Sequence, residues 1–246
     1  MKTYLIGTGG VGSYLAPPLY RTLRAALPGS TLVLVDGDTV TEANLNRQLF
    51  GPSDVGRKKA KALSRTLRKD EQCGIEIVDR YLIPDHPWAE NLTPGPDDIF
   101  IVAVDNHAAR RAALAESDKW GCCTIIAANE DSAADAYVYL PSFAGHEILD
   151  PRLRIPAILT DTSGDPTHPE GCTGDAALTA APQTAEANYV ASALALRLFG
   201  AWAIKRKEMD REYHKYLPAR LESTFTRFDT FSVEDLLNTT PKTKAA

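Results

Sequence analysis

A buried strand that runs directly into a glycine-rich turn opens the chain and limits the folds available to it. The apolar residues 4–6 precede the turn, and a second apolar run at residues 31–35 ends in an acid, Asp36. The glycines of the turn are Gly7, Gly9, Gly10 and Gly12. Strand, glycine turn, helix and a second strand ending in an acid predict a nucleotide-binding βαβ unit.

The residues of this unit have separate expected roles. Gly7 permits the tight turn, Gly9 lets backbone N–H groups approach a phosphate, and Gly12 brings helix and strand close together. Asp36 is placed to accept hydrogen bonds from ribose hydroxyls. The phosphates would lie at the N-terminus of the helix. Redox enzymes, methyltransferases and adenylating enzymes all use such a turn, so the turn alone does not select among them.

Polar residues that follow Asp36 exceed what a dehydrogenase needs. An amide, a guanidinium and an ammonium come in turn at Asn44, Arg47 and Lys59. Arginine offers a planar fork of donors to phosphate oxygens, and lysine offers a compact charge. This set favours a triphosphate ligand.

A further apolar strand, residues 98–104, leads into Asp105 and Asn106. Open α/β sheets bind ligands at the carboxyl ends of their strands. Asp105 is therefore expected to hold Mg²⁺ on the phosphates. His107 follows directly and lies near this expected metal site.

At these positions the sequence resembles the ThiF/MoeB/ubiquitin-activating superfamily of adenylating enzymes. The match covers roughly residues 1–200 and keeps the order and approximate spacing of the superfamily motifs. The matching motifs are Gly7-x-Gly9-Gly10-x-Gly12-Ser13, Asp36-x-Asp38-x-Val40, Asn44-Leu45-x-Arg47-Gln48, Gly56-x-x-Lys59 and Asp105-Asn106. A short chain of this kind is also similar to ThiF-like proteins of bacterial mobile elements and plasmids of the PRTRC type.

The resemblance implies ATP-dependent adenylation of a protein C-terminal carboxylate. Asp36 would hold the ribose, while Asn44, Arg47 and Lys59 would contact phosphates and Asp105 would hold Mg²⁺. Asp38 either orients Mg²⁺ or Arg47 or serves the fold alone. The remaining motif residues expected to border ATP are Gly7, Gly9, Gly10, Gly12, Gln48 and Asn106. An attacking carboxylate and a polyphosphate repel each other, so catalysis would consist mainly of charge neutralisation and positioning.

Four cysteines occur, with no Cys-x-x-Cys pair among them. We therefore expect neither a disulfide framework nor a structural zinc site. Cys172 lies in the region where relatives place a cysteine that takes the acyl group, and it is the candidate for such a transfer; the alternative is an incidental loop cysteine. Cys122 and Cys123 are interpreted as core residues, and Cys73 as a loop residue.

Composition is that of an ordinary globular protein, with 246 residues, 44% hydrophobic and 24% charged. The net charge of −5 argues against general nucleic-acid binding. No uninterrupted apolar run is long enough to span a membrane, and a strand begins at once with no signal peptide. We expect a cytoplasmic protein that binds neither membranes nor nucleic acids.

Alternating strands and helices predict a doubly wound α/β fold with a mostly parallel, Rossmann-like sheet. We expect one adenylation domain at residues 1–236, a crossover loop at about 141–182 that passes over the active site, and a flexible tail at 237–246. The strand at 136–140 should turn the sheet antiparallel. The first helix should span about 13–27, with Pro17 and Pro18 causing a kink or a late start.

Relatives that act as homodimers supply an arginine from a segment upstream of the first strand, and here the chain begins Met1-Lys2-Thr3. Arg21 and Arg57 are candidates to replace it. The expected partner is a small ubiquitin-like or sulfur-carrier protein ending in glycine, with a homodimer as the expected assembly. Alternative functions are action on a small molecule or tRNA, an NAD-dependent oxidoreductase, and a nucleotide-binding scaffold without turnover.

Overall fold

The computed structural model of the protein describes residues 1–67, 71–82, 93–129, 134–161, 184–204, 219–222 and 227–230. For the last two ranges it describes the backbone only.

An eight-stranded mixed sheet forms the centre of the described structure, in the order β3-β2-β1-β4-β5-β6-β7-β8. The strands are β1 (Lys2–Ile6), β2 (Ser30–Val35), β3 (Cys73–Val78), β4 (Ile99–Val102), β5 (Cys123–Asn129), β6 (Ala134–Tyr139), β7 (Ala219–Glu222) and β8 (Arg227–Thr230). Pairing is parallel from β3 through β5 and antiparallel from β5 through β8. This confirms the predicted fold class, including the antiparallel extension.

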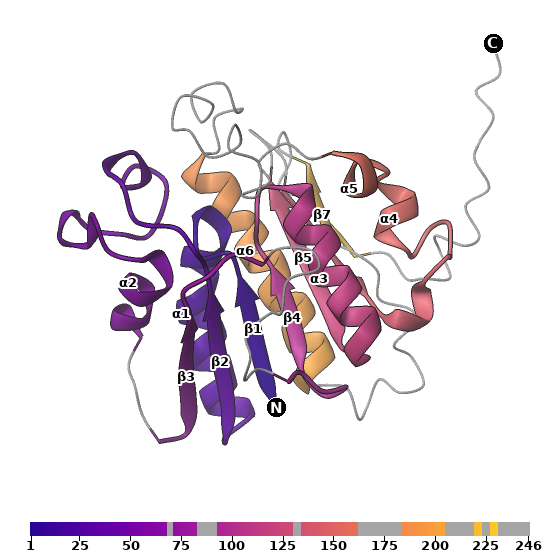
Figure 1. Ribbon diagram of the computed structural model, residues 1–246, viewed down its shortest axis with the longest axis horizontal. Coiled ribbons are helices and arrows are strands. Elements are labelled where there is room, and N and C mark those ends of the chain that lie inside the picture. Colours follow the sequence, from indigo (N-terminus) through magenta and orange to yellow (C-terminus); the bar gives the residue numbers. More distant parts are fainter. Residues whose placement is uncertain are drawn as a thin grey trace, which may run out of the picture.

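Two helical layers cover the sheet (Figure 1). The longer helices are α1 (Gly10–Ala26), α2 (Lys59–Thr66), α3 (His107–Trp120) and α6 (Ala185–Phe199). Side chains alternate along each strand, so Leu5 faces the cluster with α1, α2 and α6, while Tyr4 and Ile6 face the cluster with α3. Burial on both faces explains why the central strands are almost entirely apolar.

Helix α1 is continuous from Gly10 to Ala26 although it contains Pro17 and Pro18. The predicted late start is therefore wrong. Leu15, Leu19 and Leu23 of this helix are fully buried. Burial of these side chains stabilises the helix by more than the lost backbone hydrogen bonds destabilise it.

Helix α6 crosses the same face as α1 and packs against β5 and β6 (Figure 1). A π-helical segment, η5 (Gly200–Ile204), extends it. Together these 20 residues are long and apolar enough to cross a membrane by length and composition. In the fold, 44% of their most apolar 18-residue stretch is buried inside the protein. Thr184 caps the first turn by accepting a hydrogen bond from the Ala187 backbone N–H at 3.1 Å.

Residues 141–161, the first half of the expected crossover loop, pack along α3 and carry regular structure. They contain η3 (Pro141–Phe143), α4 (Pro151–Arg154) and α5 (Ala157–Thr160), with Phe143 and Ile158 buried against α3. The Arg111 guanidinium of α3 donates to the Ile158 carbonyl at 2.8 Å. The rest of the expected crossover loop, residues 162–182, lies outside the described residues.

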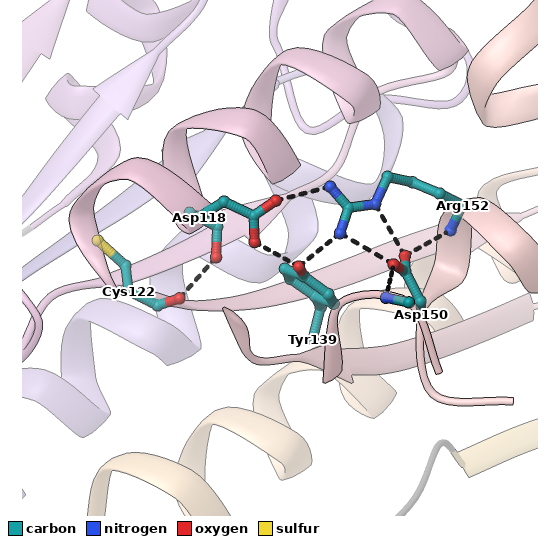
Figure 2. Close-up of polar contacts among 7 residues, drawn as sticks. Asp118, Cys122, Tyr139, Asp150 and Arg152 are labelled. Carbon is teal, nitrogen blue, oxygen red and sulfur yellow. Dashed lines mark hydrogen bonds and ion pairs between the residues drawn. The ribbon is translucent and has the colours of Figure 1, made fainter. Parts of the chain in front are cut away.

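A cluster around Arg152 joins this segment to Asp118 of α3 and Tyr139 of β6 (Figure 2). Tyr139 pairs with Thr124 near the start of β5, so the cluster lies at the end of the sheet opposite the glycine turn. The guanidinium of Arg152 lies 2.6 Å from Asp118 Oδ2 and 2.8 Å from Asp150 Oδ1, and donates to the Tyr139 hydroxyl. The Tyr139 hydroxyl also bonds to Asp118. Burial alone would raise the pKa of Asp150, but hydrogen bonds from Arg152 and from the Gly145 backbone hold it below its ordinary value.

Three of the cysteines lie inside the fold. Cys122 and Cys123 are buried at the start of β5, which confirms their interpretation as core residues. Cys73 is also buried as the first residue of β3, so its interpretation as a loop residue is wrong. Cys172 lies outside the described residues.

Candidate nucleotide-binding site

The expected site residues gather where the strand order reverses. Strand β1 lies between β2 and β4. From β2 the chain continues to β3 on one side of β1, whereas from β4 it continues to β5 on the other side. Such a switch point opens a crevice at the carboxyl ends of the strands. The glycine turn after β1, the residues after β2 and the residues after β4 all meet there.

Close contacts at the turn require two of its glycines. Gly7 has a φ of 88°, and a Cβ at this position would lie 2.5 Å from the Ala103 carbonyl oxygen. A Cβ at Gly12 would lie 1.9 Å from the Gly7 carbonyl oxygen. These distances confirm the tight turn and the close helix–strand approach that the sequence predicted.

Space at Gly9 is open by comparison. A Cβ there would meet nothing nearer than the Gln48 amide nitrogen at 3.6 Å. Gly9 immediately precedes α1, whose first N–H groups have no partner within the helix. The fold itself thus leaves room at Gly9, and a bound phosphate is the kind of group that would need it.

Asp36 is fixed rigidly at the end of β2. Its Oδ2 accepts hydrogen bonds from the Thr8 backbone N–H at 2.7 Å and the Thr8 hydroxyl at 2.8 Å, and its Oδ1 accepts from the Asp38 N–H at 2.8 Å. Burial raises the pKa of Asp36, against the lowering effect of Lys59 and the backbone donors. A carboxylate has about four acceptor positions, so one remains for a ribose hydroxyl.

Asp38 and Lys59 form an ion pair beside Asp36. The Lys59 ammonium lies 2.8 Å from Asp38 Oδ2, and the lysine side chain is only 10% exposed. The Tyr81 hydroxyl donates to the other oxygen of Asp38. Burial would raise the pKa of Asp38, but the Lys59 charge and these hydrogen bonds outweigh burial and lower it.

Arg47 and Gln48 lie in a well-ordered turn with unused polar atoms. The Asn44 carbonyl accepts hydrogen bonds from the N–H groups of Arg47 at 3.3 Å and Gln48 at 2.9 Å. Asn44 Oδ1 accepts from the Thr41 N–H at 3.0 Å. Arg47 Nε and Gln48 Oε1 are buried with no hydrogen-bond partner among the described residues. Buried polar atoms without partners are uncommon in folded proteins and indicate a missing ligand or water.

The residues that follow β4 have two different roles: one is available to a ligand and another stabilises the start of α3. Asp105 is exposed, and the structure gives its carboxylate no ion pair with the described residues. Asn106 is the N-cap of α3 and accepts from the Ala109 N–H at 2.8 Å, so its side-chain oxygen already serves the helix. The guanidinium of Arg110 donates to the Val104 carbonyl at 2.9 Å and lies 3.4 Å from His107 Nδ1. Burial and the Arg110 charge lower the pKa of His107.

Asn188, Thr8, Tyr81 and Arg110 border the site and were not expected there. Asn188 is fully buried in the first turn of α6 and donates to the Arg47 carbonyl at 3.1 Å. Its sequence surroundings are rich in alanine, and nothing local marks it. Thr8 lies within the glycine turn and could have been suspected from its position next to Gly7. The two candidate replacements for the upstream arginine, Arg21 and Arg57, are exposed.

The residues present fit ATP with a magnesium ion. Gly9 at the start of α1 and Arg47 Nε, unpartnered among the described residues, suit phosphate oxygens, and Asp105 offers an exposed carboxylate. Magnesium commonly takes one or two protein carboxylates and completes its coordination with phosphates and water. Within the described ranges, no three His, Cys, Asp or Glu side chains are grouped to hold a metal by themselves.

Fold and site together define an α/β protein with a Rossmann-like sheet and a candidate nucleotide-binding site. The sequence matches the ThiF family over residues 1–142. More than half of the chain is matched, and the chain therefore belongs to the ThiF family.

Known proteins of similar sequence are enzymes by name. One is tRNA threonylcarbamoyladenosine dehydratase of Escherichia coli K12, 33% identical over 113 residues, which are 45% of this chain and 40% of the relative. Another is ubiquitin-like modifier-activating enzyme 5 of Rattus norvegicus, 29% identical over 153 residues, which are 57% of this chain and 37% of the relative. The matched region thus spans less than half of each of these relatives.

Solved structures share the fold. The chain is similar to E. coli MccB crystallised with ATP, at a TM-score of 0.63 and 17% identity, covering 94% of this chain and 63% of MccB. It is similar to PaaA at a TM-score of 0.63 and 18% identity, covering 94% of this chain and 64% of PaaA.

Proposed function

We propose that the protein adenylates the C-terminal carboxylate of a small protein or peptide at the expense of ATP. One observation carries the proposal: among the described residues Arg47 has a buried Nε without a hydrogen-bond partner, and the side chain of the next residue, Gln48, borders Gly9 of the glycine turn. A guanidinium with an unused donor has the geometry and charge to bind phosphate oxygens.

The reaction would need charge neutralisation more than proton transfer. A carboxylate oxygen attacks the α-phosphorus of ATP, a P–O bond forms, and the bond to the β-phosphate breaks with the electron pair leaving on pyrophosphate. Arg47 and Lys59 would offset the charge that makes attacking and attacked groups repel each other. Asp36 would hold the ribose and so set the position of the α-phosphate. A magnesium ion bound by Asp105 would supply further positive charge on the phosphates.

Relatives and structural neighbours support a carboxylate-bearing substrate of small size. One relative is named as activating a ubiquitin-like modifier, and the MccB neighbours include one crystallised with AMPCPP and MccA. We extend this to a ubiquitin-like or sulfur-carrier protein ending in glycine as the substrate. The dehydratase relative supports a second candidate, a carboxylate on tRNA. The net charge of −5 weighs against tRNA.

Pyrophosphate exchange tests the proposal directly. The protein is incubated with ATP, Mg²⁺, labelled pyrophosphate and a panel of small ubiquitin-like proteins ending in glycine, each also prepared as its C-terminal amide. Exchange that requires a free C-terminal carboxylate supports the proposal. Pyrophosphate exchange that requires tRNA would support the second candidate instead. ATP binding without any exchange would indicate a nucleotide-binding scaffold. Binding of NADH in place of ATP would indicate an oxidoreductase.

A matched pair of variants keeps the result specific. Arg47→Ala should lower exchange by at least about 100-fold, the usual effect of removing one donor to a developing anion. Arg65→Ala, at an exposed position at the end of α2, should leave exchange within about twofold. Equal activity of the two variants would contradict the role of Arg47.

The proposal extends to Cys172, to assembly and to location. Transfer of the acyl group from the adenylate to Cys172, with AMP as the leaving group, predicts that Cys172→Ala keeps pyrophosphate exchange but forms no thioester; if both persist, the cysteine has no part in the reaction. A homodimer in the cytoplasm is the assembly and location that we propose, and sedimentation of the purified protein tests the first of these.

A further inference from the structure

One asparagine of α6 joins three elements of the site that are far apart in the sequence. Asn188 is fully buried and donates from Nδ2 to the Arg47 carbonyl at 3.1 Å. Its Oδ1 accepts from Asn129 Nδ2, at the end of β5, at 3.1 Å. A Cβ on Gly10, the first residue of α1, would lie 2.4 Å from the same Oδ1. The Asn188 amide is therefore in contact with three parts of the fold: the glycine turn at Gly10, the loop at residues 44–50 that contains Arg47, and the sheet at Asn129.

The Arg47 backbone is held from both sides. Its N–H donates to the Asn44 carbonyl at 3.3 Å, within the loop itself, whereas its carbonyl is held by Asn188, which is 141 residues away in sequence. The local hydrogen bond is long, since N–H···O bonds usually lie near 2.9–3.0 Å. The bond from Asn188 ties Arg47 itself to α6, while the Leu49 N–H, which donates to Ser13 Oγ at 3.0 Å, ties the end of the loop to α1.

A second polar residue fixes α6 to α1 without touching this loop. Ser192 lies one turn further along α6, and its hydroxyl oxygen is 2.7 Å from both the Val11 carbonyl and the Asn188 carbonyl, so its single proton can be donated to either. It is buried like Asn188. The helix thus has one polar contact that holds Arg47 and another that only joins the two helices, and the two can be separated by mutation.

We infer that Asn188 is a positioning residue for Arg47, setting the guanidinium at the correct distance from the phosphate-binding turn. The inference rests on the proposed function only for its consequence in ATP binding. Loss of Asn188 leaves the Arg47 carbonyl and the Asn129 amide without their partner in a buried place. The loop is then free to shift, and a shift of about 1 Å is enough to weaken a positioned catalytic group severely.

Amide hydrogen exchange without nucleotide tests the positioning itself. In Asn188→Ala, exchange across residues 44–50 should become at least about 10-fold faster than in the wild type. In Ser192→Ala, exchange of the same segment should stay within about twofold, although both variants lose thermal stability. Unchanged exchange in Asn188→Ala, or equal acceleration in both variants, would overturn the inference. Should Asn188→Ala fail to fold, Asn188→Ser is measured in its place.

A double-mutant cycle tests the consequence for ATP. Asn188→Ala and Arg47→Ala should each weaken ATP binding by about 10-fold or more, as expected for a charge-assisted hydrogen bond that is lost or displaced. In the Arg47→Ala background, Asn188→Ala should add less than about twofold. Effects that multiply would show that Asn188 acts independently of Arg47 and would overturn the inference.

Failure of the two proposals can be told apart. If the wild type binds no ATP while Asn188→Ala still loosens residues 44–50, the positioning contact stands and the proposed function falls. If the wild type binds ATP and catalyses pyrophosphate exchange, but Asn188→Ala leaves amide hydrogen exchange of residues 44–50 unchanged, the proposed function stands and the inference falls.

Discussion

The ammonium of Lys59 lies 2.8 Å from Oδ2 of Asp38, and only 10% of the lysine side chain is exposed. An ammonium has three donors, so one bond to Asp38 leaves two for phosphate oxygens. Asp38 in turn accepts from Tyr81. The position of the lysine is thus set before any nucleotide arrives, and this reduces the ordering cost of binding.

Replacing Lys59 by methionine should abolish most of the exchange activity while preserving the fold. Met fills the volume of the buried stem but carries no charge, so the loss should be about 100-fold or more in pyrophosphate exchange. Lys61→Met is the matched control, because Lys61 lies two residues further along α2 and is exposed. Equal activity of the two variants would remove Lys59 from the site.

Substitutions at two glycines should separate folding from binding. Gly9→Ala should leave the melting temperature within about 2 °C of the wild type, because the new Cβ would meet nothing nearer than 3.6 Å, but it should weaken ATP binding by filling the phosphate position. Gly12→Ala should destabilise the whole protein, because its Cβ would lie 1.9 Å from the Gly7 carbonyl oxygen. Thermal melting and equilibrium ATP binding measure both effects. Tight ATP binding by Gly9→Ala would place the phosphates elsewhere.

Neutralising Asp105 should remove the magnesium dependence of ATP binding. Asp105→Asn keeps the shape of the exposed side chain but loses the charge that attracts a divalent cation. Titration of ATP with and without Mg²⁺ should show a difference in affinity for the wild type and little difference for the variant. Thermal stability should be unchanged, and a variant that retains full magnesium dependence would contradict the assignment.

Low pH should lower the stability of the folded protein by disrupting the cluster around Arg152. The pKa of Asp150 in the folded protein lies below its ordinary value, so its contribution is complete above about pH 4 and is lost as the pH falls through the folded pKa. Asp150→Asn should lower stability at pH 7 by about 3 kcal/mol, or roughly 6–12 °C, because it leaves a largely buried guanidinium without one charged partner. It should also flatten the dependence of melting temperature on pH below about 4.

An exposed ion pair provides the control for this change. Lys2 and Glu76 lie 2.9 Å apart with side chains 35% and 41% exposed. Glu76→Gln should cost less than about 1 kcal/mol and leave the acid sensitivity unchanged. A steep acid transition in Asp150→Asn would show that other carboxylates dominate. Pyrophosphate exchange should survive Asp150→Asn, since the cluster lies at the end of the sheet opposite the glycine turn.

Much of the fold was predictable because its signals are local. Apolar runs ending in Gly7 or Asp36 predict strands joined through a glycine turn, and the described sheet confirms the strands. Of the kink or late start expected from Pro17 and Pro18, the late start is wrong, because burial on both sides of the prolines outweighs their local preference. Residues 141–161 were expected to form a loop because their short helices have no lasting apolar period, and packing against α3 decides their structure.

The sequence indicated the site residues that lie close together along the chain but not the one that lies far from them. Asp36, Arg47 and Lys59 lie within one stretch, and motif spacing indicated them together. Asn188 could not be found in this way, because its role depends on a contact with Arg47 that only the folded chain creates. Asn106 shows the opposite difficulty: it was expected to border the nucleotide, and its side-chain oxygen caps α3.

The contact between Gly10 and Asn188 has an evolutionary consequence. A side chain at position 10 would strike the Asn188 amide, so a larger residue there would require a smaller one at position 188. Positions 10 and 188 are therefore expected to change together among related proteins, with the combination of two bulky residues excluded.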